Sequence, residues 1–92
     1  MRTNRLLAAA MLVAVTMPAA PTPAAAQQCL NLYKMRNLIY KRNGYCFKTA
    51  KAKRLIGNGG CTIKNQSNVK LSQAERDQVA KIIRKEKEAG CR

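Results

Sequence analysis

The sequence predicts a small all-α, three-helix domain that is stabilised by disulfides. Apolar residues recur at three- and four-residue spacing in separate segments, and glycines follow the ends of those segments. The chain of 92 residues is long enough for one domain, whose core would be marginal by itself. Four cysteines that follow an apparent export signal would supply cross-links. They are Cys29, Cys46, Cys61 and Cys91.

Residues 1–26 have the organisation of a secretory signal peptide. Two arginines give a positive start, an apolar run covers residues 6–17, and Ala24-Ala25-Ala26 offers the small residues that a signal peptidase requires. The run is shorter than the ~20 apolar residues that span a bilayer. We therefore expect cleavage before Gln27. The domain of residues 27–92 would then have no transmembrane segment and would be periplasmic or secreted.

The first helix of the domain is expected over residues 31–43. Leu32, Met35 and Ile39 recur at helical spacing and would form one apolar stripe that faces the core. Gly44 follows the segment and is suited to a left-handed C-cap.

A short second helix is expected over residues 49–56, with Thr49 as its N-cap. The glycine-rich run 57–60 would end it. Phe47, the only phenylalanine, precedes this helix and is expected in the core. The polar stretch 62–70 is expected to form an ordered loop with a short extended piece.

The third helix has the clearest predicted start. Ser72 and Glu75 have the spacing of a capping box, in which each side chain accepts a hydrogen bond from the other residue's backbone amide. Val79, Ile82 and Ile83 then form an apolar stripe at helical spacing.

The cysteine spacing favours disulfides over a zinc site, because no two cysteines form a close C-x-x-C pair. Up-down-up packing of three helices favours Cys29–Cys61 together with Cys46–Cys91. The second possibility is Cys46–Cys61 together with Cys29–Cys91, since the glycine-rich run could let the chain return. The sequence alone does not decide between these pairings.

Catalysis and metal binding are not expected. The chain has no histidine, which removes the usual general base and most zinc and copper sites. Its acidic residues come in two pairs two positions apart, so the members of a pair point to different sides of a helix. Those residues are Glu75, Asp77, Glu86 and Glu88. We therefore expect no catalytic residue, no metal and no small-molecule cofactor.

The charge of the chain predicts an anionic partner. Lysines and arginines number 18 against 4 acidic residues, and residues 27–70 hold no acid. A field of one sign favours anionic partners outside the cytoplasm, such as an envelope polymer or an acidic protein. Nucleic acid is not the expected partner. The alternative is a solvated basic face that only keeps the domain soluble. The candidate anion-binding residues are Lys41, Arg42, Lys48, Lys51 and Arg54.

Residues 32–47 resemble the signature of the YARHG domain, a family of small exported bacterial domains. Lys41 stands where the family has alanine, and Asn43 where it has histidine. The resemblance implies a non-catalytic domain of the bacterial cell envelope but supplies no ligand. The alternative function is a small basic structural or inhibitor-like protein that docks on an acidic periplasmic protein. The matching positions are Arg36, Asn37, Ile39, Tyr40, Arg42, Gly44, Tyr45 and Phe47.

The expected roles of the matching Arg36 and Asn37 are structural. Arg36 would hydrogen-bond carbonyls at a helix end, and Asn37 would bond the backbone near the turn.

Overall fold

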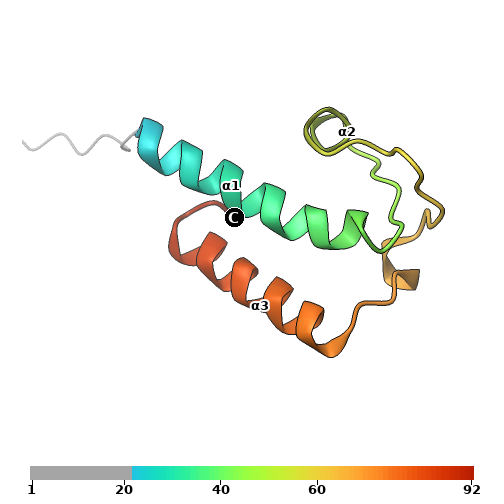
Figure 1. Cartoon of the computed structure of the whole chain (residues 1–92). Coiled ribbons are helices and arrows are strands. Elements are labelled where there is room, and N and C mark those ends of the chain that lie inside the picture. Colours follow the sequence, from blue (N-terminus) through green and yellow to red (C-terminus); the bar gives the residue numbers. More distant parts are fainter. Residues whose placement is uncertain (1–21) are drawn as a thin grey trace, which may run out of the picture.

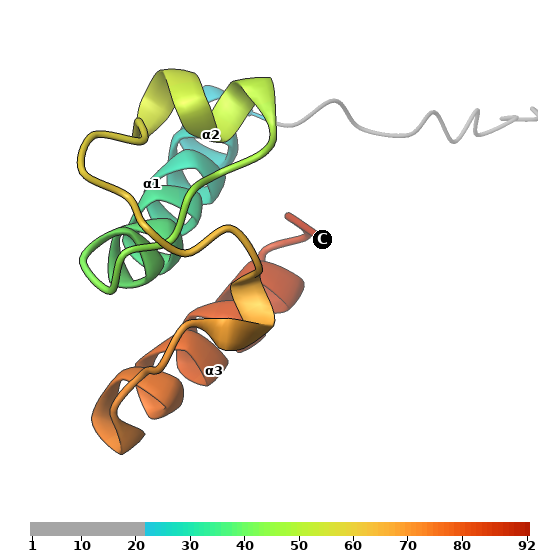
Figure 2. The ribbon, with the colours of Figure 1, turned by 90° about the vertical axis from the view of Figure 1, so that its right-hand side faces the viewer.

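The computed structural model describes residues 22–92, which form three α-helices and one turn of 3-10 helix, without strands in that range. They are α1 (Pro23–Lys41), α2 (Ala50–Leu55), η2 (Gln66–Asn68) and α3 (Gln73–Glu88). The helices α1 and α3 lie side by side and run in opposite directions (Figure 1). The short helix α2 lies on another side of α1 (Figure 2). The predicted all-α, three-helix fold is confirmed.

Helix α1 begins eight residues before the predicted start at residue 31. Thr22 is its N-cap and accepts a hydrogen bond from the amide of Ala25 at 3.0 Å, and Pro23 occupies the first turn. Proline is pre-organised for this position and alanine is the strongest helix former, so the same residues that suggest a cleavage site also favour a helix. The predicted cut before Gln27 falls inside α1. Of the described residues it would remove only 22–26, which are exposed or half-exposed and belong to neither core cluster.

The core consists of two clusters of buried side chains. The first joins α1 to α3 and consists of Leu32, Ile39, Val79 and Ile82. The second joins the α1–α2 connection to α2 and consists of Tyr45, Phe47 and Ala52, packed against Tyr33 and Tyr40 of α1. The core position predicted for Phe47 is confirmed. Only part of the predicted stripe on α1 is correct, because the Met35 side chain is 52% exposed.

The chain turns sharply after α1. Gly44 has a φ of 92°, which suits glycine alone, and a Cβ there would lie 3.1 Å from the hydroxyl of Thr62. The Gly44 carbonyl accepts from the amides of Thr62 and Ile63, each at 2.8 Å, and Tyr45 and Ile63 form an isolated parallel bridge. The polar stretch after the glycine-rich run is therefore an ordered loop with a short extended piece, as predicted.

The predicted caps of the other two helices are confirmed. The Thr49 hydroxyl accepts from the amide of Ala52 at 3.1 Å at the start of α2. At the start of α3 the Ser72 hydroxyl accepts from the amide of Glu75 at 3.1 Å, and the Glu75 carboxylate accepts from the amide of Ser72 at 3.0 Å.

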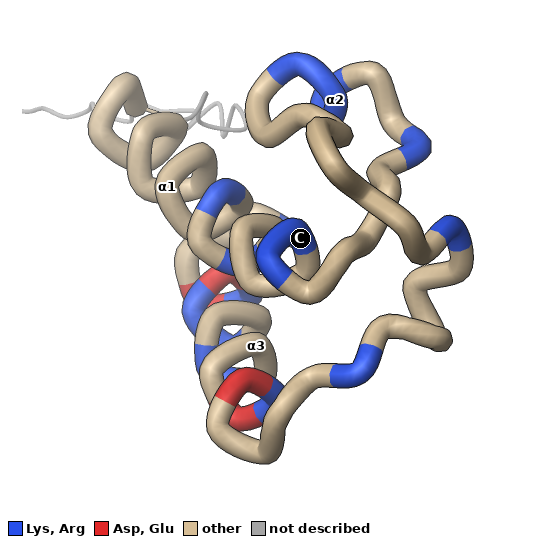
Figure 3. Tube along the Cα trace, turned by 45° about the vertical axis from the view of Figure 1, so that its right-hand side comes forward, with Lys and Arg blue, Asp and Glu red and all other residues tan. Residues whose placement is uncertain are grey.

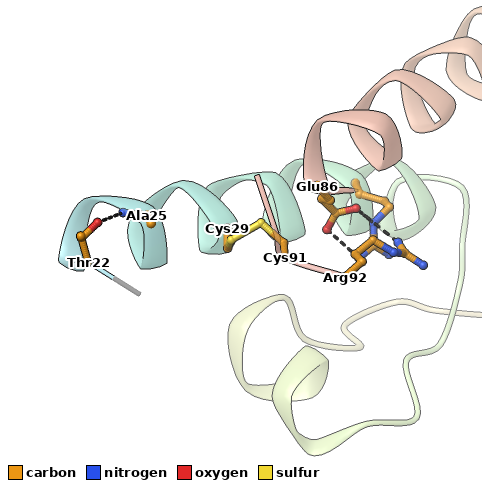
Figure 4. The surroundings of a disulfide bond; sticks show 7 residues. Thr22, Ala25, Cys29, Glu86, Cys91 and Arg92 are labelled. Carbon is orange, nitrogen blue, oxygen red and sulfur yellow. Dashed lines mark hydrogen bonds and ion pairs between the residues drawn. A yellow bond between two sulfur atoms is a disulfide. The ribbon is translucent and has the colours of Figure 1, made fainter. Parts of the chain in front are cut away.

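The disulfides are Cys29–Cys91 and Cys46–Cys61, so the preferred pairing was wrong and the second possibility is correct. The reason is helix length. Helix α1 has 19 residues and spans about 28 Å, whereas the six residues of α2 span only about 9 Å. Such a short helix cannot carry Cys61 back along α1 to Cys29. Helix α3 instead carries Cys91 back to Cys29 (Figure 4).

Candidate functional site: a basic surface around α2

Charges are unevenly distributed over the described residues. All four acidic side chains belong to α3, while basic side chains occur on every helix and in the loop that follows α2 (Figure 3). Two of the acids, Glu75 and Glu86, form ion pairs with basic residues of other segments. Some basic side chains are therefore already paired within the domain, and only those without such contacts are fully available to bind an anionic partner.

Glu86 ties α3 to α1 in a buried ion pair. The residue is 2% exposed, and its carboxylate accepts from Arg36 Nε at 2.8 Å and Arg36 Nη2 at 3.0 Å. Arg92 donates to the same carboxylate at 3.3 Å (Figure 4). Burial opposes ionisation, but the hydrogen bonds and charge of Arg36, followed by those of Arg92, hold the pKa of Glu86 below its ordinary value. The helix-end role expected for Arg36 was wrong.

The two asparagines of the family signature segment bond the backbone of α1. Asn37 is buried, and its amide nitrogen donates to the Tyr33 carbonyl at 2.9 Å. Its backbone bond is confirmed, although it lies inside the helix rather than at the turn. At the turn itself Asn43 donates to the Ile39 carbonyl at 2.7 Å.

Glu75 is the second carboxylate that reaches across to α1. Its Oε2 accepts from Arg42 Nε at 3.0 Å and from Asn43 Nδ2 at 2.9 Å. The hydrogen bond from the Ser72 amide, then those from Asn43 and Arg42, lower the pKa of Glu75 to about 2. Residues 27–70 hold no acid of their own, but Glu75 of α3 neutralises Arg42.

Two further candidates, Lys41 and Lys51, contribute to the contact between α1 and α2. The Lys41 ammonium donates to the Gly57 carbonyl at 3.2 Å. The Lys51 ammonium lies 4.1 Å from the centre of the Tyr33 ring, a cation–π distance. These side chains are therefore partly occupied by contacts within the domain.

Lys48 and Arg54 are exposed. In the described part of the chain they form neither an ion pair, as Arg42 does, nor a contact like those of Lys41 and Lys51. Lys48 borders a hollow of about 280 Å³ together with Lys53 and Lys64, a group that we call the lysine hollow. The Asn58 side chain holds the wall of this hollow, because it accepts from the Phe47 amide at 2.7 Å and donates to the Phe47 carbonyl at 3.0 Å.

The candidate set predicted from sequence missed Lys53 and Lys64. Lys64 belongs to a different segment, and the Tyr45–Ile63 bridge brings that segment beside Cys46. The signal that could have found it is the Cys46–Cys61 pairing, because Lys48 and Lys64 follow their cysteines by two and three residues.

The described residues contain no group of three His, Cys, Asp or Glu side chains placed to hold a metal ion. All four cysteines are in disulfides. Between residues 22 and 92 no helix has the length and apolar character needed to cross a membrane.

These features define a small disulfide-bonded all-α domain whose signature segment forms the second half of α1 and the turn after it. The family model of the YARHG domain matches residues 8–87, which is most of the chain, so the protein belongs to the YARHG domain family. A search of curated proteins and a search of solved structures gave no match. The disulfides and the family fit an extracellular domain.

Proposed function

We propose that this protein is a non-catalytic binding domain of the cell envelope and that its lysine hollow contacts anionic groups of an envelope polymer. One observation carries the proposal: Lys48, Lys53 and Lys64 come from three segments, yet they border one hollow in a region, residues 44–70, that holds no acidic residue. Arg54 is exposed on the same short helix and would extend the contact.

The electrostatics favour a polymer with repeated negative charges. A single exposed ion pair contributes little, because water and salt screen it. Several lysine side chains without a nearby carboxylate create a local positive field, which attracts a partner with several negative charges more strongly than a partner with one. Lys41 and Lys51 would support this surface by fixing α2 against α1.

The contacts of the carboxylates support a non-catalytic role. Glu75 caps α3 and Glu86 is buried under two arginines, so both are held ionised by hydrogen bonds within the domain. Neither is placed to donate a proton to a substrate at neutral pH. The domain is proposed to work after cleavage before Gln27, in the periplasm or outside the cell.

Retention on dextran sulfate, with neutral dextran as the control matrix, tests the proposal. We expect retention on the charged matrix alone, with affinity that falls steeply as salt rises. The triple variant Lys48→Gln, Lys53→Gln, Lys64→Gln, called the hollow triple variant, should bind about tenfold more weakly, equivalent to about 1.4 kcal/mol.

The matched control is the triple variant Lys70→Gln, Arg84→Gln, Lys87→Gln. It removes the same charge from exposed positions outside the hollow and should change affinity less than about twofold. Equal weakening in both triple variants would show that net charge alone drives binding. Retention that is insensitive to salt would contradict the electrostatic mechanism.

A further inference from the structure

A second surface, on the seam between α1 and α3, is unlike the lysine hollow. Met35 and Leu38 are the large apolar side chains that stay exposed among the described residues, at 52% and 46%. They border a hollow of about 430 Å³ whose deeper part is formed by Ile39 and Ile82. We call this hollow the α1–α3 groove.

The groove lies on the side of α1 that other parts of the domain leave open. Tyr33 and Tyr40 pack against the cluster that contains α2. Because an α-helix turns about 100° per residue, Leu38 and Met35 lie on roughly the opposite side of α1 from those tyrosines. The groove is therefore the uncovered side of a two-helix seam whose other side is covered by the α2 cluster and the loop.

Basic side chains border the groove on both helices. Lys81 and Lys85 lie one turn apart on the α3 side, and Arg42 lies on the α1 side. Arg42 is already paired with Glu75, whereas Lys81 and Lys85 are exposed and form no ion pair in the described part of the chain. No carboxylate borders the groove. The surface thus combines an apolar floor with a positive rim. The floor consists of Met35, Leu38, Ile39 and Ile82, and the rim consists of Arg42, Lys81 and Lys85.

We propose that the α1–α3 groove binds an acidic amphipathic helix of a partner protein. The inference goes beyond the proposed function, because it concerns a different surface and a different class of ligand. A helix in this groove would place apolar side chains at i, i+3, i+4 and i+7 on the floor. Carboxylates beside that stripe would meet Lys81 and Lys85, whose one-turn spacing matches acids one turn apart on the partner.

Charge complementarity favours this occupant over two others. A second copy of the chain would bring a second strongly basic surface to the rim, since the chain has 18 basic and 4 acidic residues. A membrane surface would require a broad apolar face, and the described residues expose only two large apolar side chains. An acidic helix satisfies both the floor and the rim.

The test uses three synthetic helical peptides and the oxidised, isotope-labelled protein. The first peptide carries leucines at i, i+3, i+4 and i+7 with flanking glutamates, the second has lysine for each glutamate, and the third has the first composition in shuffled order. We expect saturable binding of the first peptide alone, with NMR amide shifts around Met35, Leu38, Lys81 and Lys85. Absence of binding, or equal binding of the lysine or shuffled peptide, would overturn the proposal.

Two double variants locate the binding. Met35→Gln with Leu38→Gln removes the exposed part of the apolar floor, and Lys81→Gln with Lys85→Gln removes the rim charges. Each should weaken binding of the acidic peptide about tenfold, while the hollow triple variant should leave it within about twofold. All four residues are exposed, and the rim pair keeps the test valid if the floor pair lowers the thermal unfolding midpoint.

The other occupants are distinguished in the same experiment. Dimerisation that is lost in the floor variant would assign the groove to a second copy. Binding of anionic vesicles with the same shifted amides would assign it to lipid. Either result overturns the acidic-helix proposal, while unchanged dextran sulfate binding would leave the proposed polymer function standing.

Discussion

The pair formed by α1 and α3 and the lobe formed by residues 44–70, called the α2 lobe, are held together by different means. In the helix pair, aliphatic packing is joined by carboxylates that reach from α3 to Arg36 and Arg42. In the α2 lobe, aromatic packing is joined by amide hydrogen bonds from Asn58 and by a cation–π contact. Each region is closed by its own disulfide.

This difference explains where the positive surface lies. Two of the four acidic residues, Glu75 and Glu86, join α3 to other segments and neutralise arginines at the α1–α3 seam. The α2 lobe is stabilised without carboxylates, and its lysines form no ion pair in the described part of the chain. The ion pairs thus leave unpaired the exposed lysines of the α2 lobe and, on α3, Lys81 and Lys85 beside the α1–α3 groove.

The largest expected effect is the loss of a disulfide, and it should differ between the two regions. Cys29→Ala with Cys91→Ala removes a closure across 62 residues, and Cys46→Ala with Cys61→Ala removes one across 15. From loop-closure entropy we expect losses of about 4 and about 3 kcal/mol in the free energy of unfolding. Urea denaturation of both variants measures this order, and the reverse order would show that the α2 lobe depends more on its cross-link.

The next effect is confined to the helix pair. Glu86→Gln leaves Arg36 without its charged partner in a largely buried position, so the free energy of unfolding should fall by about 3 kcal/mol. The matched control Glu88→Gln changes an exposed acid two residues further along α3 and should cost less than about 0.5 kcal/mol. Similar losses in both variants would mean that the ion pair does not join the helices as described.

The smallest effect is a pH dependence that also belongs to the helix pair. The folded pKa of Glu75 is about 2 against an ordinary value of 4.5, and the pKa of Glu86 is lowered too. Lowered carboxylate pKa values give stability that is present above the ordinary pKa and is lost as the pH falls through the folded value. The thermal unfolding midpoint should therefore fall between about pH 5 and pH 2.

Glu75→Gln provides the control for this pH dependence. The variant should be less stable than the parent at pH 6, and its midpoint should fall less steeply on acidification, because one of the two carboxylates is gone. An equally steep fall would assign the acid sensitivity to other groups. The α2 lobe holds no carboxylate. Acid should therefore lower the protection of its backbone amides from hydrogen exchange less than it lowers that of α3.

The features that sequence predicted correctly are local ones. The caps at Thr49 and at Ser72 with Glu75 depend on residues three positions apart, and Phe47 is the only residue of its kind. The Arg36–Glu86 pair joins residues 50 positions apart, and no local pattern indicates it. The start of α1 was missed because the residues after Thr22 fit both a cleavage site and a helix start.

In the candidate site, too, the local feature could be predicted from the sequence and the contacts between distant segments could not. A dense basic stretch could be seen in the sequence, but the contacts that occupy Lys41, Arg42 and Lys51 depend on the packing of α2 and α3 against α1. Lys64 lies near Lys48 because the Tyr45–Ile63 bridge and the Cys46–Cys61 disulfide join their two segments. Composition therefore predicted the sign of the surface, and the fold determined which side chains form it.

The nested arrangement of the disulfides also sets an order of assembly. Cys29–Cys91 encloses Cys46–Cys61 along the chain, so in any synthesis from the N-terminus both inner cysteines emerge before the outer partner of Cys29. Cys29 must therefore stay reduced until Cys91 emerges, or pair first with Cys46 or Cys61 and later exchange that partner for Cys91. The α2 lobe can thus be cross-linked while the chain is still growing, and the last closure waits for α3.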